Sequence, residues 1–97
     1  NPQGDGNVVR INIPALSGEV RQKMVSRIKE LAEETRVSIR NVRRDGNKAA
    51  DQAEKDKNLN EDLRDDLKNE IQDLTKKYET SVNEAAQNRE TEVMEAN

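Results

Sequence analysis

The 97-residue chain contains no cysteine, histidine, tryptophan or phenylalanine, and Tyr78 is its one aromatic residue. Without cysteine, a disulfide framework and a thiolate metal site are excluded. Without histidine, the chain lacks the usual general base and the commonest transition-metal ligand. Hydrophobic residues make up only 31% of the chain, so the sequence does not predict a thick globular core. These shortages favour either disorder or long helices that bury narrow apolar stripes.

Long hydrophobic runs are also missing. No apolar segment approaches the ~20 residues of a membrane span, and no segment resembles a signal peptide. We therefore expect a cytoplasmic protein with no membrane partner. The chain begins at Asn1, without Met, inside a segment of turn and loop composition. This start predicts a fragment or a processed product.

Charged residues are abundant, at 38% of the chain, and they are distributed unevenly. Residues 21–48 hold nine of the seventeen Lys and Arg, whereas residues 51–97 are predominantly acidic. The net charge of −3 therefore conceals a basic segment within an acidic chain.

Helical periodicity is sustained along two segments. Ser17 is a plausible N-cap for a helix over residues 17–56, and Asn60 is one for a second helix over residues 60–96. On the first helix, apolar or small residues recur at spacings of three and four. They are Met24, Ile28, Leu31, Thr35, Ile39, Val42, Gly46, Ala49 and Ala53. The second helix carries a similar stripe at Leu63, Leu67, Ile71, Leu74, Tyr78, Val82 and Ala85.

The fold class predicted is all-α: a long antiparallel helical hairpin that forms an incomplete bundle, since helix bundles normally have a third or fourth helix. A connection of three to five residues makes the two helices antiparallel neighbours. Gly46 falls in phase on the apolar stripe, so we expect one continuous helix in which Gly46 admits a close approach of its neighbour. Residues 8–13 predict a short strand or extended segment that has no partner strand in this chain. The two apolar stripes can cover each other only in part, so one side of each stripe remains exposed to water. This predicts that a further helix of the bundle is absent from the chain.

The sequence gives little support to an enzyme or a metal site. Its carboxylates lie among Lys and Arg on solvent-facing helix positions, where nothing shields a general acid or base from water. Asp62, Asp65 and Asp66 lack the alternating spacing and the glycine of a calcium loop. We expect no catalytic residue, no metal and no cofactor.

The arginines of the first helix predict a polyanionic partner. Arg36, Arg40, Arg43 and Arg44 share one face at about 100° per residue. Like charges at this spacing cost helix stability, and a guanidinium donates two parallel hydrogen bonds to a phosphate. Because no aromatic residues are interleaved, the pattern favours backbone recognition of folded RNA or of DNA over base stacking. Intrahelical pairing, as between Glu33 and Arg36, is the alternative.

A resemblance to a known family covers nearly the whole chain. Residues 37–45 read Val-Ser-Ile-Arg-Asn-Val-Arg-Arg-Asp, which closely resembles the central signature of bacterial ribosome recycling factors. Residues 10–17 resemble the last strand and hinge of that family, and residues 55–62 resemble its inter-helix turn. Residues 72–75 and 89–92 are similar to its third helix and its tail.

The resemblance implies a domain plan and a function. Residues 1–16 would be the remnant of an inserted β-rich domain, with a hinge at Pro14, Ala15 and Leu16, and residues 17–97 would be two helices of the three-helix bundle. The family disassembles the post-termination ribosome together with elongation factor G and GTP. Its contact arginines match Arg21, Arg40 and Arg43, with Arg36 and Arg44 as neighbours, and their implied partner is large-subunit ribosomal RNA.

The absent parts of the domain plan lead to two further expectations. The chain is expected to be inactive in recycling by itself, because the first helix and most of the small domain are absent. It is also expected to form a homodimer through its uncovered stripes. The alternative function is a coiled-coil-like assembly module without a nucleic-acid role, in which the arginines pair with acids on a partner helix. The departures from the family pattern, which include Gly46 and Asn60, leave the arginine face intact.

Overall fold

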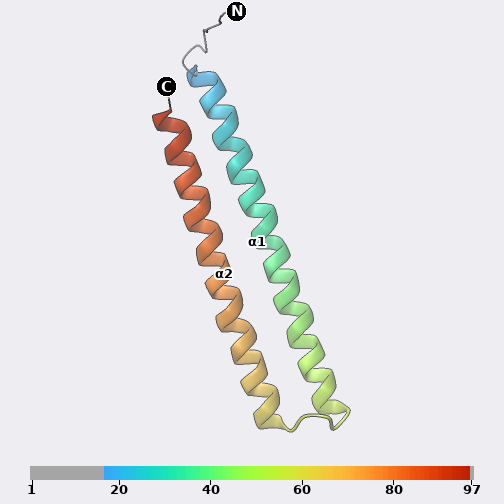
Figure 1. The fold of residues 1–97 in the computed structure, drawn as a ribbon. Coiled ribbons are helices and arrows are strands. Elements are labelled where there is room, and N and C mark those ends of the chain that lie inside the picture. The colour runs from blue at the N-terminus through green and yellow to red at the C-terminus, as the bar shows by residue number, and fades with distance from the viewer. Residues whose placement is uncertain (1–16, 97) are drawn as a thin grey trace, which may run out of the picture.

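The structure is a computed structural model that describes residues 17–96. Two helices, α1 (Gly18–Lys55) and α2 (Glu61–Glu95), run antiparallel and pack along their whole length (Figure 1). The predicted hairpin is confirmed, and the observed helix ends lie within one residue of those expected. No strand occurs among residues 17–96. The predicted strand at residues 8–13 and the hinge at Pro14, Ala15 and Leu16 lie outside the described residues.

Side-chain caps explain where both helices begin. The Ser17 hydroxyl accepts a hydrogen bond from the Val20 amide at 3.1 Å, and Asn60 Oδ1 accepts one from the Leu63 amide at 2.8 Å. Each cap satisfies an amide that has no partner within its own helix. Acidic residues occupy both first turns, where they favour the positive end of the helix dipole.

The contact line between the helices is centred on small residues. Ala50 is 1% exposed, and Val25, Ala32, Thr75 and Val93 are also buried. The three α1 residues among these lie one position after Met24, Leu31 and Ala49 of the predicted stripe. The predicted stripe was therefore rotated around α1 relative to the observed contact line, because its largest side chains lie at the edge of the contact between the helices. Alanines at the centre let two backbones approach closely, and the larger residues stay outside.

The outer part of each apolar stripe remains exposed, as expected for an incomplete bundle. The exposed large side chains on this side of the hairpin are Met24, Leu31 and Val42 of α1 and Leu67, Leu74 and Tyr78 of α2. Two open hollows of about 370 and 410 Å³ lie between the helices at the end of the hairpin away from the turn. We call this surface the apolar face.

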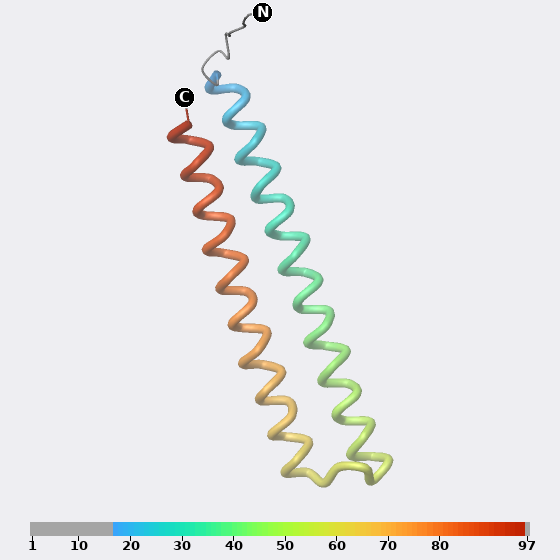
Figure 2. Tube along the Cα trace, viewed as in Figure 1, coloured from blue at the N-terminus to red at the C-terminus, as the bar shows by residue number. Residues whose placement is uncertain are grey.

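Gly46 lies inside α1, which continues through it without a break (Figure 2). A Cβ at this position would lie 3.1 Å from Cδ1 of Ile71 and 3.7 Å from two further carbons of that side chain. The isoleucine of α2 therefore occupies the space that a side chain at residue 46 would need. The prediction that Gly46 permits a close helix approach is confirmed, and this contact offsets part of the ~1 kcal/mol that glycine costs in a helix.

The end of α1 is a Schellman motif. The Asn58 amide donates to the Ala53 carbonyl at 2.9 Å, and the Lys57 amide donates to the Glu54 carbonyl at 3.0 Å. This geometry places Lys57 in the left-handed region at φ 63°, where glycine is the usual residue. A lysine there crowds its Cβ against the backbone and costs free energy.

Lys57→Gly should therefore stabilise the chain. Relief of the left-handed strain exceeds the extra freedom that glycine gives the unfolded chain, so we expect about 0.5–1 kcal/mol of added stability. Lys48→Gly, in the exposed interior of α1, is the matched control and should cost about 1 kcal/mol. Thermal melts followed by circular dichroism measure both changes, and equal destabilisation by the two variants would contradict the assignment.

Candidate nucleic-acid interface

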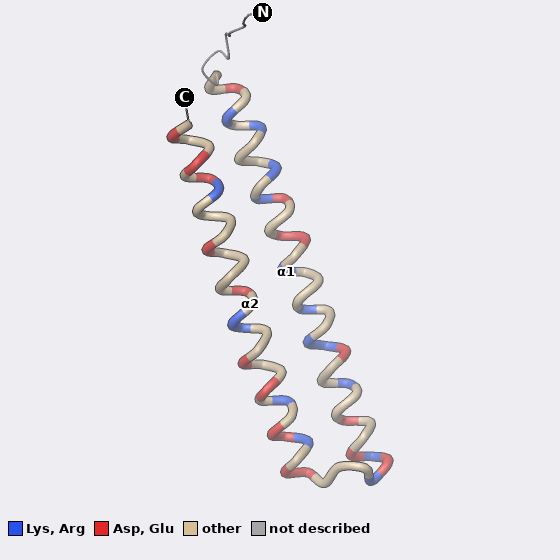
Figure 3. The backbone as a smooth tube through the Cα atoms, viewed as in Figure 1, with Lys and Arg blue, Asp and Glu red and all other residues tan. Residues whose placement is uncertain are grey.

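One flank of the hairpin, opposite the apolar face, is lined by cross-helix polar pairs. Going towards the turn, these pairs are Lys29–Glu90 at 4.0 Å, Arg36–Asn83 at 2.7 Å, Arg40–Glu79 at 3.5 Å, Asp51–Lys68 at 3.0 Å and Glu54–Arg64 at 3.5 Å. We call this row the polar ladder. Figure 3 shows basic and acidic positions along both helices.

The two helices exchange the roles of cation and anion donor along the ladder. In the half away from the turn, α1 supplies the cations and α2 supplies Glu79 and Glu90. Near the turn α1 supplies Asp51 and Glu54, and α2 supplies the cations. A sliding of one helix along the other would bring like charges together, so the ladder favours this register. The pairs are partly exposed, and each contributes only a few tenths of a kcal/mol.

Arg21 lies at the open end of the hairpin. Its guanidinium is partly buried and donates to the backbone carbonyl oxygens of Val93 and Ala96. These carbonyls belong to the last turn of α2, where they have no partner within the helix. The Arg21 side chain thus ties the two helix ends together, and a contact with RNA would have to compete with these bonds. Its predicted RNA contact stays a prediction.

Arg36 and Arg40 are both paired. Arg36 donates to Glu33 at 3.0 Å and to Asn83 at 2.7 Å, and Arg40 lies 3.6 Å from Glu33 and 3.5 Å from Glu79. The hydrogen bond from Arg36, helped by the charges of both arginines, lowers the pKa of the Glu33 carboxyl although desolvation opposes it. The intrahelical Glu33–Arg36 pair considered as the alternative role is thus present. The α2 partners Asn83 and Glu79 were not anticipated, although counting back from the turn would have placed them.

Arg43 and Arg44 differ from the other arginines. Within residues 17–96, neither side chain forms an ion pair or a hydrogen bond. Arg44 is exposed, and Arg43 is half-buried between the contact line and the polar flank. The structure therefore places all four arginines on neighbouring positions of α1 but leaves two of them with donors to spare.

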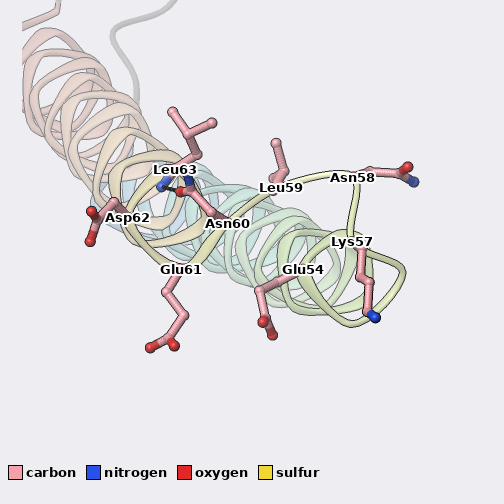
Figure 4. A pocket seen from close by; sticks show the side chains of 8 residues that line it. All are labelled: Glu54, Lys57, Asn58, Leu59, Asn60, Glu61, Asp62 and Leu63. Atoms are coloured by element: carbon pink, nitrogen blue, oxygen red, sulfur yellow. Dashed lines mark hydrogen bonds between the residues drawn. The ribbon is translucent and has the colours of Figure 1, made fainter.

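A hollow of about 790 Å³ lies at the turn between the helices. Figure 4 shows that its acidic side chains, Glu54, Glu61 and Asp62, do not converge on a common point. Two of them instead lie within 4.0 Å of Arg64. No group of carboxylates in residues 17–96 is placed to hold a metal ion. Neither α1 nor α2 is long and apolar enough to cross a membrane.

Comparison with known proteins places the chain in a family. A family profile described as ribosome recycling factor matches residues 1–94. The chain belongs to the ribosome recycling factor family. A ribosome-recycling factor of Bacillus cytotoxicus is 45% identical over 95 residues, and one from Rhodopirellula baltica is 78% identical over 50 residues.

The two alignments differ in extent. The Bacillus cytotoxicus alignment covers 98% of this chain but 51% of the relative, and the Rhodopirellula baltica alignment covers 52% of this chain and 27% of the relative. The chain thus spans about half the length of the longer-matching relative.

Proposed function

We propose that this chain is the RNA-binding half of a translation factor that disassembles the post-termination ribosome with elongation factor G and GTP. Its arginine face binds phosphates of large-subunit ribosomal RNA, and the factor acts mechanically in the cytoplasm, without catalysis, metal or cofactor. The ribosome-recycling factors to which the chain is similar support the recycling role. Residues 1–16 are proposed as the remnant of the small domain and its hinge.

The observation that carries this proposal is that the guanidinium groups of Arg43 and Arg44 are unpaired within the described part of the chain. A coiled-coil assembly module would pair its cations with acids of the partner helix, as Arg40 is paired with Glu79 here. Arg43 and Arg44 lack such partners within residues 17–96, although like charges at neighbouring helix positions are unfavourable. Two unpaired guanidiniums on one helix face are suited to phosphate oxygens, which accept paired hydrogen bonds from each.

Arg43→Gln tests the proposal, with binding of a labelled helix of large-subunit ribosomal RNA measured over a range of salt concentrations. Loss of one phosphate contact should weaken binding and reduce the slope of log affinity against log salt by about 0.7–0.9. Arg27→Gln removes the same charge from an exposed position that pairs with Glu30, and should leave the slope close to that of the unsubstituted chain. Circular dichroism should show equal helicity in all three proteins. Equal salt slopes for Arg43→Gln and Arg27→Gln would show that Arg43 serves the hairpin structure and does not contact the RNA.

We also infer that the apolar face associates with a second copy of the chain. Leu31 of α1 is 45% exposed, and Leu74 and Tyr78, one turn apart on α2, are 54% and 55% exposed on the same side of the hairpin. Packing of two such faces would remove these side chains from water while leaving the arginine-bearing flank accessible. The two proposals therefore concern opposite sides of the molecule.

A further inference from the structure

The polar ladder keeps one register along the hairpin. Each step towards the turn on α1 is matched by an equal step on α2, from Arg36–Asn83 to Arg40–Glu79 and on to Asp51–Lys68. Three residues beyond Arg40 is Arg43, and three residues beyond Glu79, in the direction of the turn, is Lys76. The register therefore sets Arg43 opposite Lys76, at a step where both helices supply a cation.

The packing of the hairpin does not account for this step. Two cations facing each other across neighbouring helices repel, whereas the steps on either side join opposite or complementary groups. Within the described part of the chain, Lys76, like Arg43, has no ion pair and no side-chain hydrogen bond. The closest acid along the ladder, Glu79, is engaged by Arg40 at 3.5 Å. One turn from Arg43, the buried Oδ1 atom of Asn47 also lacks a hydrogen-bond partner.

We propose that Arg43 and Lys76 together bind one phosphate group of a nucleic-acid backbone, held between α1 and α2 on the polar flank. This inference rests on the proposed function and adds α2 to an interface otherwise confined to α1. The guanidinium supplies two directed donors, and the ammonium supplies a compact positive charge on a flexible stem. A bound phosphate would replace the mutual repulsion of the two cations by two attractive contacts.

The test compares Lys76→Gln with Lys77→Gln in the 97-residue chain, using a labelled helix of large-subunit ribosomal RNA as the probe. Lys77 carries the same charge but lies beside Leu74 on the apolar side of α2, which makes it a matched control. Lys76→Gln should reduce the salt slope by about 0.7–0.9, so its loss of affinity grows about five- to eightfold between 1 M and 0.1 M salt. Lys77→Gln should change the slope much less.

Two further variants separate a ligand site from a structural role. Lys76→Glu would complete the ladder opposite Arg43, so it should raise the melting temperature while weakening RNA binding more than Lys76→Gln. In the double variant Arg43→Gln/Lys76→Gln the losses should be less than additive, because both residues serve one phosphate.

The outcomes are distinct. If Arg43→Gln flattens the salt slope but Lys76→Gln behaves like Lys77→Gln, the two-helix site is wrong and the α1 interface stands. If the unsubstituted chain shows no salt-dependent binding of the RNA, the proposed function and the two-helix site fail together. Strictly additive losses in the double variant would overturn the sharing of one phosphate.

Discussion

Sedimentation equilibrium of the 97-residue chain should show a concentration-dependent dimer. The physical reason is the apolar face, where Met24 and Leu31 line two open hollows and Leu67, Leu74 and Tyr78 are exposed further towards the turn. Full burial of one large apolar side chain is worth about 1.5–3 kcal/mol. Several such side chains from each copy, each already half covered, are enough to exceed the entropic cost of association.

The double variant Leu31→Gln/Leu74→Gln should shift this equilibrium to monomer, with a dissociation constant raised at least about tenfold, since it removes two large side chains from each copy. Val37→Gln is the control, because Val37 is 42% exposed on the opposite side of α1. It should leave the dissociation constant close to its original value. A sharply melting monomer at every concentration would show that two helices suffice without a partner.

Disassembly of post-termination ribosomes gives the second large effect. With elongation factor G and GTP present, the chain alone should not release subunits, whereas the Bacillus cytotoxicus factor, which is about twice as long as the matched region, should. If the factor acts as a rigid body pushed against the ribosome, as proposed, a chain that spans about half of the relative's length should not transmit the push. Breakdown of polysomes by the chain alone at the rate of the complete factor would contradict this expectation.

A chimera makes the result specific to this sequence. The chain should restore activity when it replaces the 95 aligned residues of the Bacillus cytotoxicus factor. In this chimera, Arg43→Gln should lower the recycling rate severalfold, whereas Arg27→Gln should have little effect, because Arg27 pairs with Glu30 on the helix surface. An active chimera that is indifferent to Arg43→Gln would separate the fold of this chain from the proposed RNA contact.

Local sequence features determined the two helices and their ends. Ser17 and Asn60 are capping residues whose side chains satisfy free amides wherever they precede a helix, so tertiary packing was not needed to place the starts. The short connection of residues 56–60 made the helices antiparallel neighbours. The in-phase position of Gly46 likewise predicted a continuous α1 with a close contact, and the contact proved to be Ile71. The arginine face could be predicted from the sequence for the same reason, since helical periodicity alone sets which residues share a face.

Only the tertiary structure decided which partner each side chain meets. Periodicity fixes directions within one helix but not the rotation of one helix against another, so the contact line at Val25, Ala32 and Ala50 was missed. The pairing of Arg36 with Asn83 and the capping of α2 by Arg21 depend on the inter-helix register, which is settled by packing over the whole hairpin. The same register opposes Arg43 to Lys76, residues more than thirty positions apart. The arginine pattern of α1 therefore predicted a polyanionic partner, and the packing of the two helices decided which of these side chains have partners within residues 17–96.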